Sequence, residues 1–302
     1  MIPALLALLF APVAAARNAV VILRSDDLPV YSAPIESFKR ELSLPIQVMD
    51  LRGDKAQALR TAQQLAADPP PLIFALGAKA AYIATQQLPQ VPLVYAMVVD
   101  PARYGIEGIQ VTGITMQLPP DMVLAQFQLF VPKVKTIGLL ISSDNTDPSV
   151  SAALEAARAA GYKVTARRVA PGDDVRRAYA ALRKNVDAIW LLPDSKLLTP
   201  SNFRTLQQES RRAHLPLLVY SEGLVEAGAL LCVAPDYANL GGQAASLAQR
   251  ILGGENPGAI APEAPTASRV VLNRETQDAI GLAIDPQNLA FVDSVVHEPT
   301  RR

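Results

Sequence analysis

The chain runs twice through the same succession of short apolar segments and amphipathic segments. Each apolar segment is short enough for a strand, ends in polar residues and is followed by a helical pattern. The second series begins about 117 positions after the first and keeps nearly the same spacing. The clearest matched segments are residues 19–23 with 137–141, 72–77 with 188–193, and 92–95 with 216–220. One such match arises easily by chance, but an ordered series indicates two similar lobes, which we interpret as a duplication.

Each series has the order β-α-β-α-β-α-β. Its apolar segments are continuous rather than alternating, which is typical of parallel strands that helices cover on both faces. Half of the 302 residues are hydrophobic, so the chain has enough apolar side chains to fill two cores. We therefore predict an α/β protein with two similar Rossmann-like lobes, each built on a parallel sheet.

The charge balance and the residue counts exclude several classes of protein. The chain has 28 basic and 28 acidic side chains, whereas a nucleic-acid-binding protein shows a basic face and usually a basic total. A single cysteine excludes an internal disulfide and any zinc site built on cysteines. With only two histidines, we expect neither a metal site nor a cofactor.

Residues 1–16 carry no charged side chain and end in three consecutive alanines. This pattern predicts a secretory signal peptide, cleaved after Ala16 to leave Arg17 at the mature N-terminus. The apolar segment is shorter than the roughly 20 residues that a membrane-spanning helix needs. No cysteine follows it, which argues against a lipid anchor. A misassigned start site or an uncleaved N-terminal helix is the alternative.

Polar residues follow the predicted strands at the points where ligands bind in parallel α/β sheets. Backbone N–H groups at the helix starts there can hold an anion. Ser, Asp and Asn are also common N-caps, so each position alone has a structural explanation as well. The positions are Ser25, Asp26, Gly77, Ala78, Lys79 and Asp100 in the first series, and Ser142, Ser143, Asp194, Ser195, Ser221 and Glu222 in the second.

Catalytic motifs are absent from the sequence. It contains no G-x-S-x-G, no phosphate-binding loop and no G-x-G-x-x-G after a strand. His214 follows a predicted helix and is interpreted as a helix-terminal charge, while Cys232 is interpreted as a small buried apolar residue. We predict no catalytic residue and no enzymatic activity.

Several stretches together resemble one family. They are Gly77-Ala78, residues 92–95, Asp100-Pro101, Thr112-Gly113, and residues 228–230, 235–237, 241–252 and 281–284. In this order and spacing they resemble the substrate-binding proteins of ABC transporters with the type I periplasmic-binding-protein fold. The similarity is to the branch that includes tryptophan and aromatic-amino-acid binders, and it extends over roughly residues 19–286.

This resemblance implies a two-lobed clamp that closes on a small solute in the cleft between its lobes and presents it to an ABC permease in the inner membrane. The implied hinge has three segments, near residues 112–119, 232–236 and 261–268. Lobe 1 would hold residues 17–116 and 234–262, lobe 2 would hold 117–233 and 266–290, and 291–302 would form a tail. We expect a periplasmic monomer that binds neither nucleic acid nor metal.

The candidate ligand contacts combine the strand-end residues with two tyrosines. Tyr31 or Tyr237 could stack on a flat group, and Tyr237 could equally pack in the hinge. Ser142, Ser143 and the backbone at Ala78 could take an anionic group, and Asp100 or Asp194 a cationic amine. The full set is Ser25, Tyr31, Ala78, Lys79, Asp100, Ser142, Ser143, Asp194, Ser221 and Tyr237.

Three departures from the family pattern lie near the expected cleft. Val111 replaces an Asn, Lys79 stands where a small residue is usual, and residues 232–234 replace Ser-Tyr-Gly. The sequence therefore does not name the solute. Two alternatives remain: a ligand-sensing module of a signalling system that uses the same clamp, and a two-lobed nucleotide-sugar enzyme. A neighbouring kinase or cyclase gene would favour the first, and a nucleotide-phosphate site the second.

Overall fold

The computed structural model describes residues 19–170 and 174–296. The predicted signal peptide, Arg17, His297 and the end of the predicted tail lie outside these residues. The described chain forms two compact units. Unit 1 contains residues 19–117 and 237–266, and unit 2 contains 118–236 and 267–296. The chain therefore passes from one unit to the other three times, after residues 117, 236 and 266.

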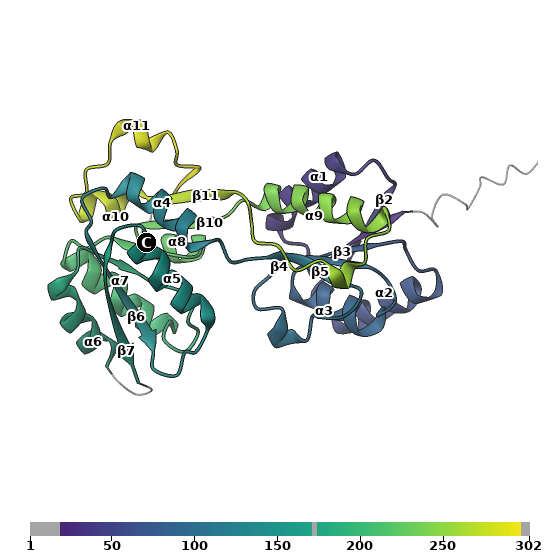
Figure 1. The fold of residues 1–302 in the computed structure, drawn as a ribbon, viewed down its shortest axis with the longest axis horizontal. Coiled ribbons are helices and arrows are strands. Elements are labelled where there is room, and N and C mark those ends of the chain that lie inside the picture. Colours follow the sequence, from purple (N-terminus) through teal and green to yellow (C-terminus); the bar gives the residue numbers. More distant parts are fainter. Residues whose placement is uncertain (1–18, 171–173, 297–302) are drawn as a thin grey trace, which may run out of the picture. The chain divides into compact units, whose positions relative to one another are not determined.

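Unit 1 is a five-stranded parallel sheet with the strand order β2-β1-β3-β4-β5 (Figure 1). Short 3-10 turns lie at Pro29–Tyr31 (η2), Ala102–Tyr104 (η3) and Pro257–Ala259 (η5). Its strands and helices are β1 Val20–Arg24, α1 Ser32–Glu41, β2 Ile46–Asp50, α2 Lys55–Ala67, β3 Ile73–Leu76, α3 Ala78–Gln87, β4 Leu93–Val98, β5 Val111–Thr115 and α9 Tyr237–Leu252.

Strand β1 shows why this unit needs helices on both faces of its sheet. Val20 and Ile22 belong to the core cluster beneath α1 and α9, whereas Val21 and Leu23 belong to the cluster beneath α2 and α3. Helices α1 and α9 lie side by side although they are far apart in the sequence (Figure 1). Their close approach depends on Gly241, because a Cβ there would collide with the backbone of Pro34.

Unit 2 is a seven-stranded sheet with the order β12-β11-β10-β9-β8-β6-β7. A 3-10 turn at Arg183–Asn185 (η4) follows α6. Its strands and helices are α4 Pro120–Phe130, β6 Thr136–Ser142, α5 Pro148–Ala159, β7 Lys163–Val169, α6 Val175–Leu182, β8 Ala188–Trp190, α7 Pro200–Arg212, β9 Leu217–Val219, α8 Glu222–Glu226, β10 Leu231–Pro235, β11 Ser268–Asn273, α10 Arg274–Ala279, α11 Pro286–Leu289 and β12 Ser294–Val296.

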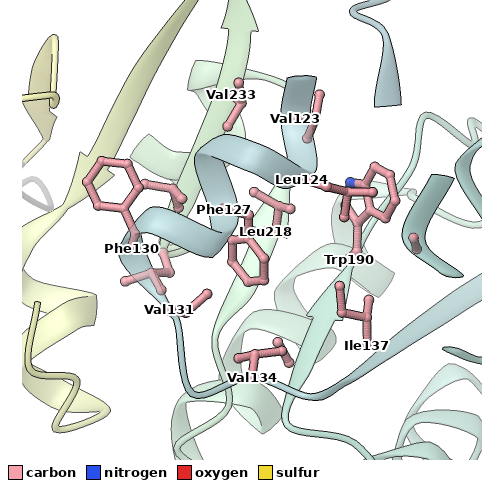
Figure 2. Close-up of a cluster of buried hydrophobic side chains, with 14 of the residues drawn as sticks. Val123, Leu124, Phe127, Phe130, Val131, Val134, Ile137, Trp190, Leu218 and Val233 are labelled. Carbon is pink, nitrogen blue, oxygen red and sulfur yellow. The ribbon is translucent and has the colours of Figure 1, made fainter. Parts of the chain in front are cut away.

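Helix α4 covers one face of this sheet with an apolar stripe (Figure 2). Its Leu124 and Phe127 pack in one cluster with Trp190 of β8 and Leu218 of β9. Phe127 is fully buried, and burying a side chain of this size stabilises the fold by about 1.5–3 kcal/mol. A second cluster fills the opposite face beneath α6 and α7. The predicted α/β class with two parallel-sheet lobes is confirmed.

Two details of unit 2 differ from the sequence-based expectation. Strand β11 runs antiparallel to β10, because β10 leads the chain out of unit 2 and β11 leads it back along the same edge. Residues 294–296, which the sequence places in a separate tail, form β12 parallel to β11. Strand β12 has only three residues, which are too few for a pattern of polar and apolar side chains to indicate a strand.

Candidate ligand-binding residues

The strand ends of unit 1 are tied together by Ser25. Its buried Oγ donates a hydrogen bond to the carbonyl of Leu76 and accepts one from the N–H of Ala80, each at 2.9 Å. These bonds join the carboxyl end of β1 to the end of β3 and to the first turn of α3. Both hydrogen-bonding functions of the hydroxyl are therefore used within the protein.

The hydroxyl of Tyr31 lies against Ser25 and the backbone of Gly77. Only 8% of Tyr31 is exposed, and burial raises the pKa of its hydroxyl while a hydrogen bond with Ser25 lowers it. Gly77 has φ +86°, and a Cβ there would collide with the Tyr31 hydroxyl and come within 2.7 Å of Ser25 Oγ. Tyr31 thus packs in the core of unit 1 and presents no free ring face for stacking.

Helix α3 begins directly after this contact. By helix geometry the N–H groups of Ala78 and Lys79 have no partner within the helix. The next two N–H groups have partners: that of Ala80 donates to Ser25 Oγ, and that of Ala81 donates to the carbonyl of Gly77. Lys79 is exposed, and its Nζ donates to the carbonyl of Gly53 in the loop after β2.

The end of β4 has an irregular backbone that the sequence did not predict. Met97 and Asp100 adopt positive φ angles of 58° and 54°, and the pairing of β4 with β5 shifts between Tyr95 and Val98. Positive φ is unfavourable for both residue types, and such bulges are often found beside functional sites. Asp100 lies two residues beyond β4 and is exposed, and its carboxylate accepts a hydrogen bond from the N–H of Arg103 at 3.2 Å.

In unit 2, the carboxylate of Asp194 organises the strand ends. It is 7% exposed and lies after β8. It accepts hydrogen bonds from the N–H and Oγ of Ser142, from Nδ2 of Asn145, and from the N–H groups of Lys196 and Leu197. Burial alone would raise the pKa of Asp194, but the hydrogen bonds, those from Ser142 first, outweigh burial and lower it.

The other predicted contacts, Ser143, Ser221 and Tyr237, differ in their burial and in their hydrogen bonds. Ser143 is exposed at the end of β6, while Arg168 donates to the carbonyls of Ser143 and Asn145 at 3.2 Å. Ser221 is half-buried at the start of α8, and its side chain caps no N–H of that helix. Tyr237, the first residue of α9 in unit 1, is half-buried against the α1 and α9 core cluster.

Apart from Tyr237, which starts α9 where the chain enters unit 1, each unit thus brings its predicted residues near the carboxyl ends of its own strands. Ser25, Tyr31, Ser142 and Asp194 have internal partners, whereas Ala78, Lys79, Asp100, Ser143 and Ser221 keep polar groups at the surface or at a helix start. Sequence reasoning missed Tyr220, which follows β9 and is 38% exposed. The available signal was an aromatic residue directly after an apolar strand.

Residues 19–170 and 174–296 contain no group of three or more His, Cys, Asp or Glu side chains placed to hold a metal ion. Within the same ranges, every helix is too short or too polar to cross a membrane.

Comparison with known proteins adds relatives and a family. A tyrosine-binding protein of Clostridioides difficile (strain R20291) is 23% identical over 268 residues, which cover 86% of this chain and 77% of that protein. The ligand-free, open structure of a substrate binding protein with adhesive properties from Clostridium difficile has a TM-score of 0.74 and 22% identity, over 93% of this chain and 100% of that one.

An ABC domain in complex with L-Trp from Streptococcus pneumonia gives a TM-score of 0.56 at 22% identity, over 92% of this chain and 100% of that one. At these identities the likeness shows the shared fold, which is that of type I periplasmic binding proteins. The family described as ABC transporter substrate binding protein matches residues 36–296. The chain therefore belongs to the family of ABC transporter substrate binding proteins.

Proposed function

We propose that this protein is exported to the periplasm, serves as the solute-binding component of an ABC importer and has no catalytic activity. The family match over residues 36–296 is the observation that carries the proposal. The uncharged residues 1–16 support export, since they have the apolar segment and small residues of a signal peptide. As a monomer, the protein would deliver its solute to a permease in the inner membrane.

The solute that we propose is an amino acid or a molecule of similar size. One relative is called a tyrosine-binding protein, and another was solved with L-Trp. An amino acid carries a carboxylate, an ammonium group and a side chain, so its site needs hydrogen-bond donors, an acidic acceptor and a surface for the side chain. The strand ends of the two units offer all three.

Unit 1 supplies candidate groups for the charged ends of the solute. The N–H groups of Ala78 and Lys79 at the start of α3 suit a carboxylate. The Lys79 ammonium, which donates to the Gly53 carbonyl, adds a positive charge in this region of unit 1. The exposed carboxylate of Asp100 suits an ammonium group. Ser25 and Tyr31 act as positioning residues, because their bonds fix the loop that leads into α3. Tyr237 is either a ligand contact or a hinge residue, since it stands where the chain enters unit 1.

Unit 2 supplies Ser143 and Ser221 as direct contacts. Asp194 and Ser142 are better explained as positioning residues, because a ligand ammonium would have to displace several donors from a nearly buried carboxylate. Solute held by groups from both units would favour a closed state only if it binds that state more tightly than the open one. The three chain crossings would then act as the hinge.

Uptake measurements in the native organism test the importer role. Deletion of the gene should abolish uptake of one labelled amino acid, and the restored wild-type gene should recover it. Unchanged uptake of every solute that the purified protein binds would contradict the importer role and favour a ligand-sensing module.

A further inference from the structure

Tyr220 differs from Tyr31 and Tyr95, two tyrosines near the strand ends of unit 1, because its side chain is exposed. It follows β9 and is 38% exposed, whereas Tyr31 and Tyr95 are buried in unit 1. Its hydroxyl has no hydrogen bond to any residue in 19–170 or 174–296. An aromatic ring and a phenolic donor are therefore available at this sheet end.

The strand that Tyr220 follows contributes to the apolar layer beneath α4. Leu218 of β9 pairs with Trp190 of β8, and both lie in the cluster beneath α4 (Figure 2). Tyr220 lies two residues beyond Leu218 and directly after the last residue of β9, so it stands at the open end of this strand. Leu192, two residues beyond Trp190, is half-buried against that cluster. Tyr220 thus stands at the carboxyl end of the sheet, directly after a strand whose Leu218 belongs to this apolar layer.

The polar neighbour of Tyr220 is Asp194. Burial raises the pKa of the Tyr220 hydroxyl, and the negative charge of Asp194 raises it further. The hydroxyl therefore remains protonated and can donate a hydrogen bond at neutral pH. Asp194 itself is fixed by its hydrogen bonds with Ser142 and Leu197.

We propose that Tyr220 is a ligand-contacting residue that selects solutes with a planar apolar group, its ring packing on that group and its hydroxyl donating to an acceptor on the solute. This inference rests on the proposed function. The ring provides a flat apolar surface, and offset stacking of aromatic groups adds to the area that they bury. Tyr31, one of the two tyrosines that the sequence offers for stacking, cannot serve in this way because it is buried in the core of unit 1.

Titration calorimetry with L-tryptophan and L-leucine tests the proposal on the full exported protein. Tyr220→Ala should weaken L-tryptophan binding about tenfold and L-leucine binding much less, since only the indole stacks. Tyr220→Phe should retain most of the affinity for L-tryptophan. Tyr82→Ala is the matched control, because Tyr82 is also exposed but lies within α3; this variant should bind both probes as wild type does.

The possible outcomes separate the inference from the proposed function. Binding of L-tryptophan by Tyr220→Ala within twofold of wild type overturns the role of Tyr220. Wild-type protein that binds L-leucine but not L-tryptophan overturns planar selection and leaves the proposed function intact. Wild-type protein that binds neither probe nor any other amino acid overturns both. Equal urea midpoints for the variants and wild type would show that a loss of affinity is not a loss of folding.

Discussion

Ser142 Oγ lies 2.6 Å from Oδ2 of Asp194, which also accepts the N–H of Ser142 at 2.8 Å. One side chain after β8 thus holds both the side chain and the backbone at the end of β6. Hydrogen bonds to a nearly buried carboxylate are among the stronger ones in proteins, and removing the acceptor leaves buried donors without partners. This pair therefore fixes the end of β6, where Ser143 stands.

Replacing Asp194 should destabilise unit 2. Asp194→Ala removes the acceptor for Ser142 and Leu197, and we expect a loss of about 3 kcal/mol in the free energy of unfolding, measured by urea denaturation. Ser142→Ala should lose about 1–2 kcal/mol. Ser143→Ala is the matched control, since the side chain of Ser143 is exposed, and its midpoint should not move. Equal midpoints for Ser142→Ala and Ser143→Ala would contradict this role.

The contribution of Asp194 should depend on pH in one direction. Its pKa is lower in the folded protein than in the unfolded chain, so its stabilising effect is complete above the unfolded value of about 4. The effect is lost as the pH falls through the folded pKa. The difference in unfolding free energy between wild type and Asp194→Asn should therefore be constant near neutral pH and shrink below about pH 4. A difference that grows on acidification would show that the sign is wrong.

Gly77 should tolerate no side chain, for two separable reasons. Gly77→Ala places a Cβ at φ +86° and against the Tyr31 hydroxyl and Ser25 Oγ, so we expect a loss of roughly 2–4 kcal/mol. Gly105→Ala is the control for backbone strain alone, because Gly105 has φ +62° and nothing within 4 Å of a Cβ. It should lose only about 1 kcal/mol. Urea denaturation of both variants measures these losses in unfolding free energy. Equal losses for Gly77→Ala and Gly105→Ala would exclude the steric role of Tyr31.

His214 ends α7 in the left-handed conformation. It has φ 54°, its N–H bonds to the carbonyl of Arg211, and that of Leu215 bonds to the carbonyl of Ser210, as in a Schellman motif. His214→Gly should stabilise unit 2 by about 1 kcal/mol, because glycine has no penalty at this angle. Ala213→Gly, at φ −86°, should not stabilise it. A destabilised His214→Gly variant would indicate a role for the imidazole.

Cys232 should be unreactive in the folded protein. It is fully buried in β10, and burial, with a smaller effect of Glu222, raises the pKa of its thiol to about 12. Because the thiolate is the reactive form, a chromogenic disulfide reagent should label it slowly in buffer and rapidly in denaturant. Rapid labelling in buffer would mean that this strand opens readily in the native state.

The sequence predicted the central strands of the two sheets well because strands such as β1, β3, β4 and β6 are continuous apolar runs. It predicted the strand ends as candidate positions, but not which side chains are already satisfied. Ser142 and Asp194 are 52 residues apart, so their hydrogen bond depends on β6 and β8 being neighbours in the sheet. The antiparallel pairing of β10 with β11 likewise follows from the path between the units and not from any local pattern.

Tyr220 shows why a match between two repeats does not predict the exposure of a side chain. The sequence matches it to Tyr95, but β4 continues to Val98 whereas β9 ends at Val219. Tyr95 is therefore inside its strand and 2% exposed, while Tyr220 stands beyond the end of its own. The length of a strand depends on how it pairs with its neighbours. Residues at matching positions of two repeats can therefore lie in different environments.

Solute binding is the central claim, and thermal unfolding of the exported protein with a panel of amino acids, purines, small peptides and sugars tests it most directly. A solute at 100 times its dissociation constant should stabilise the folded protein by about 2.7 kcal/mol. We predict such a shift in melting temperature for at least one amino acid. A melting temperature that no amino acid raises, at concentrations up to the millimolar range, would contradict the account.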